Sequence, residues 1–249
     1  MNLAYETLKK LGSKVSQDER VLCLLGLGSM SETSRMDIYS DMDFFLIVTK
    51  GTKASFIDNL GWLAVQPIVY SFKNTPDGYK AMFDNGVFAE FAVFEPDEMV
   101  NIGFTKGNVI YAKPGFDQTI VAPRNAPRKE AIDVNYLVNE AATNLLIGAM
   151  RERRGEKSAA FMMIQVYAAA NIMRLLETLF MVKHHDDDPY VIDRRIEMKF
   201  TESKEILAGL RQGYDRNIAS AEFALGFLKT HFEINVSLVT AIEKYIHTA

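Results

Sequence analysis

The chain changes its pattern of apolar residues near its middle. Up to residue 112, short apolar runs of strand length alternate with turn residues, whereas from Ala131 onward apolar residues recur at helical spacing. Such runs between turns are typical of strands, and a spacing of three and four residues is typical of amphipathic helices. The pattern predicts an α+β chain with a small mixed-sheet domain (1–112), a linker (113–130) and an all-helical domain (131–249).

Turn residues place the elements within each half. Asp84-Asn85-Gly86 separates two apolar runs, as a hairpin turn does, and the linker holds three of the seven prolines. The helical half should form an up-down bundle. The expected strands are 20–27, 41–49, 67–72, 79–83, 87–94 and 109–112, and the expected helices are 2–16, 53–64, 96–103, 131–153, 158–183, 190–211, 215–231 and 234–247.

Composition narrows the class of protein. A net charge of −4 argues against a nucleic-acid partner, whose binding face usually needs a basic surplus. The single cysteine, Cys23, excludes an intramolecular disulfide and a multi-cysteine zinc site. The first residues have no apolar signal core, and no run of eighteen apolar residues is present, so we expect a cytoplasmic protein without a membrane partner.

The stretch from Val21 to Val48 carries the candidate chemistry. A buried-strand run is followed at once by Gly28-Ser29, and Asp41 and Asp43 open the next apolar run. Residues two apart on a strand share a face, so these carboxylates should lie side by side, with Cα atoms about 6–7 Å apart. Two carboxylates this close repel each other unless a cation lies between them, and Mg²⁺ suits such oxygen ligands.

This arrangement resembles a known signature. Gly28-Ser29, a gap of eleven residues and Asp41-x-Asp43 are similar to the motif of the polymerase-beta-like nucleotidyltransferase superfamily, which adds a third acid on a later strand. Glu90, within VFAEFAVF, supplies that acid. Within the superfamily the chain most resembles the antibiotic nucleotidyltransferases that act on lincosamides and aminoglycosides. The small catalytic domain, the strand glutamate and the helical second half carry this likeness.

The resemblance implies roles for particular residues. Asp41, Asp43 and Glu90 would be catalytic residues and would hold Mg²⁺. The nucleotide, ATP or another nucleoside triphosphate, would bind at a set of residues in both halves, with the acceptor in the cleft between them. The proposed nucleotide-binding residues are Gly28, Ser29, Ser31, Arg35 and Arg154.

Glu90 has a physical argument of its own. Its neighbours on the same strand face are Phe88, Ala92 and Phe94, and an unpaired charge on such a face is costly. Either a cation pairs with Glu90 or its pKa rises, and both outcomes suit a general base or a third metal ligand. The alternative is a structural acid in a salt bridge.

Each remaining candidate has a plainer interpretation. Gly28-Ser29 alone would be a strand-ending turn, and Ser31 and Arg35 would belong to a solvated loop. The basic cluster that contains Arg154 suits either triphosphate oxygens or a salt-bridged surface. His184, His185 and the aspartates after them indicate a solvated connection between helices more than a metal site. These alternatives stay open at the level of sequence.

The sequence therefore predicts an enzyme. Its reaction would be a Mg²⁺-dependent transfer of AMP from ATP to a hydroxyl of a small molecule, with release of pyrophosphate. A lincosamide-type antibiotic is the first candidate acceptor, and an aminoglycoside is the next. The alternative from another class is a catalytically silent nucleotide-binding or interaction module. A homodimer is expected from the resemblance only.

Overall fold

The computed structural model describes residues 2–125, 131–183 and 191–247. The chain divides into two compact units, Met1–Pro127 and Arg128–Ala249, and each unit is described by itself. The predicted linker at 113–130 does not form a separate segment in this division. Its Phe116, Ile120 and Val121 pack into an apolar core of the first unit.

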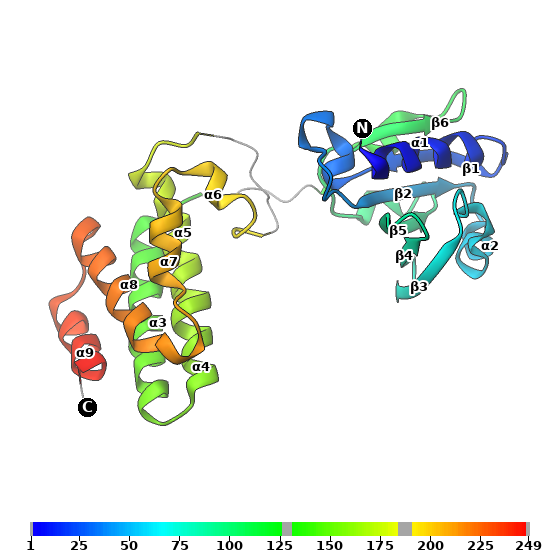
Figure 1. The fold of residues 1–249 in the computed structure, drawn as a ribbon. Helices are drawn as coiled ribbons and strands as arrows, with labels where there is room; N and C mark the ends of the chain where they lie inside the picture. Colours follow the sequence, from blue (N-terminus) through cyan, green and yellow to red (C-terminus); the bar gives the residue numbers. More distant parts are fainter. Residues whose placement is uncertain (1, 126–130, 184–190, 248–249) are drawn as a thin grey trace. The chain divides into compact units, whose positions relative to one another are not determined.

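A six-stranded mixed sheet forms the centre of the first unit, as the sequence predicts (Figure 1). The strand order is β3-β4-β5-β2-β1-β6. Only β2 and β5 run parallel; the other neighbours are antiparallel. The strands are β1 (Val21–Gly26), β2 (Met42–Val48), β3 (Ile68–Thr75), β4 (Gly78–Phe83), β5 (Phe88–Phe94) and β6 (Asn108–Ala112).

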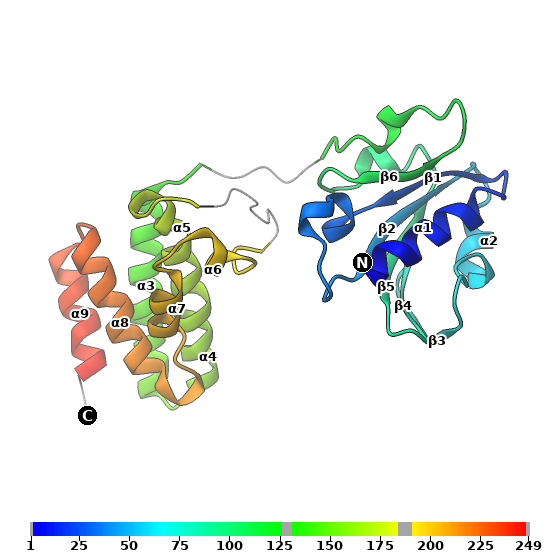
Figure 2. The ribbon, with the colours of Figure 1, turned by 45° about the horizontal axis from the view of Figure 1, so that its top comes forward.

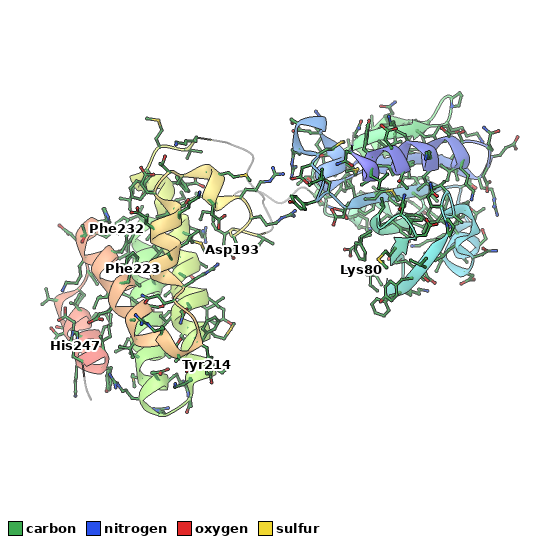
Figure 3. The ribbon with its side chains drawn as sticks, viewed as in Figure 1. Lys80, Asp193, Tyr214, Phe223, Phe232 and His247 are labelled. Carbon is green, nitrogen blue, oxygen red and sulfur yellow. The ribbon has the colours of Figure 1, made fainter. Side chains whose placement is uncertain are left out.

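The two faces of this sheet are covered differently. Helices α1 (Leu3–Val15) and α2 (Lys53–Asp58) bury Leu8 and Phe56 against Phe44 and its neighbours on one face, and α1 contacts β1 and β2 (Figure 2). The other face is covered in part by the short 3₁₀ turns η4 (Met99–Asn101) and η5 (Gln118–Val121). Toward β4 its side chains reach the surface, as Lys80 does (Figure 3).

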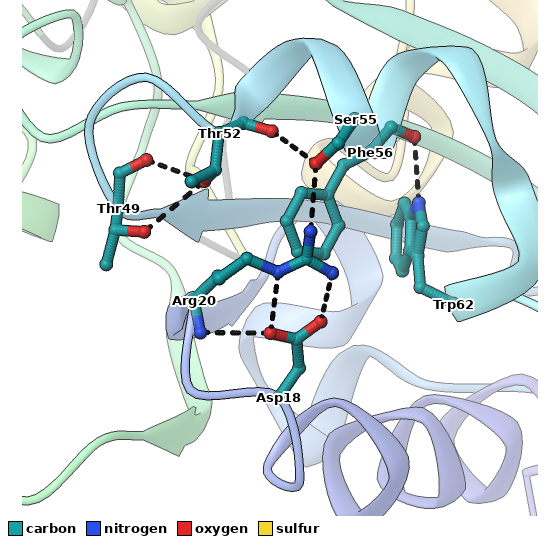
Figure 4. A network of polar contacts seen from close by, with 7 residues as sticks. All are labelled: Asp18, Arg20, Thr49, Thr52, Ser55, Phe56 and Trp62. Carbon is teal, nitrogen blue, oxygen red and sulfur yellow. Dashed lines mark hydrogen bonds and ion pairs between the residues drawn. The ribbon is translucent and has the colours of Figure 1, made fainter.

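A polar network fastens the end of the sheet where β1 begins (Figure 4). The guanidinium of Arg20 pairs with the Asp18 carboxylate and lies 4.8 Å from the centre of the Phe56 ring. It also donates to Ser55 Oγ at 3.2 Å. The hydrogen bond from Arg20 holds the pKa of Asp18 below its ordinary value. The network therefore ties β1 to α2, at the opposite end of β1 from Gly26.

The regular elements described in the second unit are all helices, and their apolar sides make one core. Among the residues that the structure describes, one helical stretch, Lys157–Leu179, is long and apolar enough to cross a membrane, but half of its most apolar window is buried inside the unit. Packing in the core thus accounts for its apolar side chains. The helices are α3 (Val134–Arg153), α4 (Lys157–Phe161), α5 (Ala169–Leu179), α6 (Ile196–Lys199), α7 (Ser203–Leu210), α8 (Asn217–His231) and α9 (Val236–His247), with a π-helical segment, Met162–Ala168, between α4 and α5.

Three predicted helices are wrong in extent. The helix expected at 53–64 ends at Asp58, because Asn59 is extended and its side chain accepts a hydrogen bond from the Gly61 amide. Only the turn η4 forms within 96–103. Within 190–211 the described residues form α6 and α7, because the chain becomes extended at Phe200, whose side chain is buried in the core. In the first and third cases a local turn or a buried side chain overrides helical spacing.

Candidate active site

The turn after β1 lies against the carboxylate of Asp43. The backbone N–H of Leu27 donates to the Asp43 carbonyl oxygen at 2.8 Å. Gly28 has a positive φ of 53°, and a Cβ at this position would lie 2.5 Å from Asp43 Oδ2. Glycine is the residue that tolerates both the left-handed backbone and this close approach. Gly28 and Asp43, which the sequence assigns to one site, are thus in direct contact.

Gly28 also begins a 3₁₀ turn, η1 (Gly28–Ser31), which is held from within. The Ser31 hydroxyl donates to the Gly28 carbonyl oxygen at 2.7 Å. Two polar atoms of this region, Ser29 Oγ and Arg35 Nε, are buried without a hydrogen-bond partner among the described residues. Buried polar atoms are almost always paired, so each of these two calls for a partner such as a ligand, an ion or a water.

Strand pairing places Glu90 beside Asp43. In the parallel pair formed by β2 and β5, Asp43 is the register partner of Glu90. Neighbouring strands lie about 4.8 Å apart, and register partners in a parallel pair project to the same face. Asp41 precedes β2 and is exposed. Within the described ranges, no three acidic, histidine or cysteine side chains come together as a group that could hold a metal.

Glu90 is held by two residues that the sequence analysis did not single out. Asn74 Nδ2 donates to Glu90 Oε1 at 2.9 Å, and Lys80 Nζ lies 3.4 Å from Glu90 Oε2. The Glu90 side chain is 45% exposed, so it is not a buried charge on an apolar face. The ion pair with Lys80 matches the alternative interpretation of Glu90, a structural acid in a salt bridge. The hairpin at 84–86 could have revealed this residue, because pairing the two strands symmetrically about Asn85 sets Lys80 opposite Glu90.

The basic cluster around Arg154 belongs to the second unit. Arg151 pairs with Glu156 at 2.7 Å, and Lys157 pairs with Asp215 at 3.1 Å. The hydrogen bond to Asp215 raises the pKa of Lys157. Arg153 donates to two carbonyl oxygens near the end of α9. These contacts agree with the salt-bridged alternative, while Arg154 itself ends α3 and is exposed. His184 and His185 lie outside the described residues.

Comparisons with known proteins give only a distant likeness. No protein-family model and no curated protein matches the sequence. Among solved structures, the chain is similar to an aminoglycoside 6-adenyltransferase from Bacillus subtilis, with 12% identity, coverage of 100% of this chain and 93% of that chain, and a TM-score of 0.36.

Two further structures are similar at about the same level. A nucleotidyltransferase-like protein from Exiguobacterium sibiricum has 10% identity, coverage of 97% of this chain and 78% of that chain, and a TM-score of 0.29. A STING-associated CdnE c-di-GMP synthase from Capnocytophaga granulosa has 13% identity, coverage of 98% and 78%, and a TM-score of 0.29. At these identities and TM-scores the likeness assigns neither a family nor an activity to this chain.

Proposed function

We propose that this protein is a Mg²⁺-dependent nucleotidyltransferase that transfers AMP from ATP to a hydroxyl of a small molecule. A lincosamide-type antibiotic is the first candidate acceptor, and an aminoglycoside is the second. The observation that carries the proposal is that the glycine turn and the strand glutamate both lie beside Asp43. Gly28 is packed against its carboxylate at the start of a helical turn, and Glu90 is its register partner on the neighbouring strand.

The turn at Gly28 is suited to phosphate oxygens. Glycine lets a ligand approach the backbone, and N–H groups at the start of a helical turn attract anions. Ser29 Oγ and Arg35 Nε are both buried without a partner in the part of the chain that the structure describes. Phosphate oxygens accept hydrogen bonds from hydroxyl and guanidinium groups, so a triphosphate would supply the missing partners of both. Ser31 instead uses its hydroxyl proton to close the turn.

The acidic residues fit a magnesium ion that is shared with the nucleotide. Mg²⁺ is usually held by one or two carboxylates together with substrate phosphates, so Asp41 and Asp43 suffice without a group of three acids. Bound there, Mg²⁺ would act as a Lewis acid that offsets the charge of the triphosphate. Glu90 would then be free to act on the acceptor.

In the proposed reaction Glu90 accepts the proton of the acceptor hydroxyl. The hydroxyl oxygen forms a bond to the α-phosphorus of ATP, the bond from that phosphorus to the bridging oxygen of the β-phosphate breaks, and pyrophosphate leaves with the electron pair. Asn74 orients Glu90 through Oε1. Oε2 is 3.4 Å from Lys80 Nζ, which is long for a hydrogen bond, so Oε2 is the oxygen that takes the proton.

Two observations favour the second candidate function, a nucleotide-binding module without turnover. Lys80 already compensates the charge of Glu90, and the acids of the described residues do not form a group of three. Such a module would bind Mg-ATP and transfer nothing. Turnover therefore separates the two candidates, and nucleotide binding alone does not.

The deciding experiment compares three proteins: wild type, Asp43→Asn and Asp58→Asn. Asp58 is an exposed aspartate at the end of α2 and serves as the matched control. Each is incubated with Mg²⁺, ATP and a panel of lincosamides and aminoglycosides, and products are analysed by mass spectrometry. We expect an adenylylated product from wild type and Asp58→Asn and none from Asp43→Asn. Equal product from Asp43→Asn and wild type would refute the assignment.

A further inference from the structure

A pocket opens beside Asp41, at the end of the sheet where β2 and β5 begin. Its volume is about 440 Å³, and its walls come from the start of α1, the loop 37–41 and the hairpin segment 85–88. Ligand sites for small molecules commonly enclose about 300–1,000 Å³, so this pocket fits a small molecule and not a folded chain.

Strand register connects the pocket to the proposed catalytic residues. Asp43 and Glu90 are register partners, and so are Met42 and Ala89. Asp41, directly before β2, and Phe88 on β5 each stand two positions before one of these acids, and both line the pocket. The Cα atoms of these two lining residues are therefore about 6–7 Å from those of Asp43 and Glu90, which do not themselves line the pocket.

The wall of the pocket is amphiphilic. Ile38 and Tyr39 are 84% and 87% exposed, a degree of exposure that marks a binding surface when large apolar side chains lie together. Asp37 holds their loop in place, because its Oδ1 accepts from the Tyr39 amide at 2.8 Å and its carbonyl oxygen accepts from the Asn2 side chain. The loop that carries Ile38 and Tyr39 is thus held in place by these hydrogen bonds.

The polar groups of the wall define what could bind beside the apolar ones. The carboxylates of Asp37 and Asp41 accept hydrogen bonds from hydroxyls, and the lining residues include no lysine, arginine or histidine. Only these two carboxylates line the pocket among the described residues, and Asp41 is also proposed to hold Mg²⁺, so Asp37 alone is left to compensate the charges of a polycation. A ligand with ring hydroxyls on one side and an apolar group on the other matches the wall better.

We infer that this pocket binds the acceptor of the proposed reaction, and that the acceptor is a hydroxylated amphiphile rather than a polycation. Its apolar group packs on Ile38, Tyr39 and Phe88, and its hydroxyls meet the carboxylate of Asp37, while Asp41 holds the proposed Mg²⁺. The inference that the ligand is the acceptor rests on the proposed function. The inference that a ligand binds here rests only on the shape and composition of the pocket.

The test uses octyl β-glucoside, a hydroxylated amphiphile, below its micelle concentration as the probe and kanamycin as the polycation. Binding to the full chain is measured by saturation-transfer NMR and calorimetry for wild type, the double variant Ile38→Ser/Tyr39→Ser and the control Val69→Ser. Val69 is 57% exposed on β3 and does not line the pocket. The substituted side chains are all exposed, so all three proteins should fold.

We expect wild type and Val69→Ser to bind octyl β-glucoside and the double variant to bind it at least fivefold more weakly. Kanamycin should show no loss of affinity in the double variant. Absence of binding to wild type, or equal binding by the double variant, would overturn the inference. Mg-ATP affinity is measured in the same samples. If wild type did not bind Mg-ATP, the proposed nucleotidyltransferase would be refuted, and the binding of octyl β-glucoside would still test the pocket.

Discussion

Replacing Gly28 with alanine tests whether the turn after β1 and the Asp43 carboxylate form one site. The new Cβ would lie 2.5 Å from Asp43 Oδ2, whereas ordinary contact begins at 3.4 Å, so the carboxylate would have to retreat by about 0.9 Å. A displacement of about 1 Å in a reacting group can cost about 100-fold in rate. Gly28→Ala should therefore lower turnover about 100-fold and weaken Mg-ATP binding.

The backbone penalty has to be separated from the contact with Asp43. Alanine in the left-handed region costs about 1–2 kcal/mol of stability at any site. Gly51 provides the control, because its φ is 79° and a Cβ there would meet nothing within 4 Å. Gly51→Ala should lower the free energy of unfolding by a similar amount and leave turnover unchanged.

The assay combines urea unfolding, followed by circular dichroism, with Mg-ATP calorimetry and product formation on the best acceptor of the panel. We expect similar unfolding curves for the two glycine variants and a large difference between them in nucleotide affinity and turnover. If Gly28→Ala bound Mg-ATP and turned over as Gly51→Ala does, the turn would have no role in positioning Asp43.

Three further predictions concern single residues. Glu90→Gln should abolish turnover and change Mg-ATP affinity less than threefold, since it removes the base and not the phosphate contacts; retained turnover in a product assay would contradict the role of general base. Lys80→Met should change the free energy of unfolding by less than about 1 kcal/mol in urea titrations, because Lys80 and Glu90 are both about half exposed, and a larger loss would mean that the pair is structural. Burial raises the pKa of the Cys23 thiol to about 12 from 9.0. Between pH 9 and 12 the thiol therefore stays protonated in the folded protein but loses its proton in the unfolded chain. The contribution of Cys23 to the free energy of unfolding is complete below pH 9 and falls by about 1.4 kcal/mol per pH unit as the pH rises toward 12. Cys23→Ala should show a flatter stability curve above pH 9 than wild type, and parallel curves would contradict the raised pKa.

Local pattern was sufficient for much of the fold. Apolar runs between turn residues predicted each of the six strands to within a few residues, and the change to helical spacing predicted a helical second half. Pattern failed where one buried side chain or one turn decides where a helix ends, as at Phe200 and Asn59. Helical spacing reports which residues could share a face, but it does not report where tertiary packing requires an extended residue.

The sequence by itself determined the local geometry of the candidate site. Gly28-Ser29 after a strand and Asp41-x-Asp43 at the start of another predict a turn and two acids close together, because a period of two fixes which side chains share a strand face, and the close approach of Gly28 to Asp43 agrees with this. Only the tertiary structure decided which strand lies beside β2. Its parallel pairing with β5 makes Glu90 the partner of Asp43, and β4 adds Lys80. The hairpin turn at 84–86 could have indicated Lys80, but the pairing of β2 with β5 joins segments far apart in the chain and no local period encodes that choice, so the contact of Asn74 with Glu90 and the pocket beside Asp41 became visible only in the folded chain.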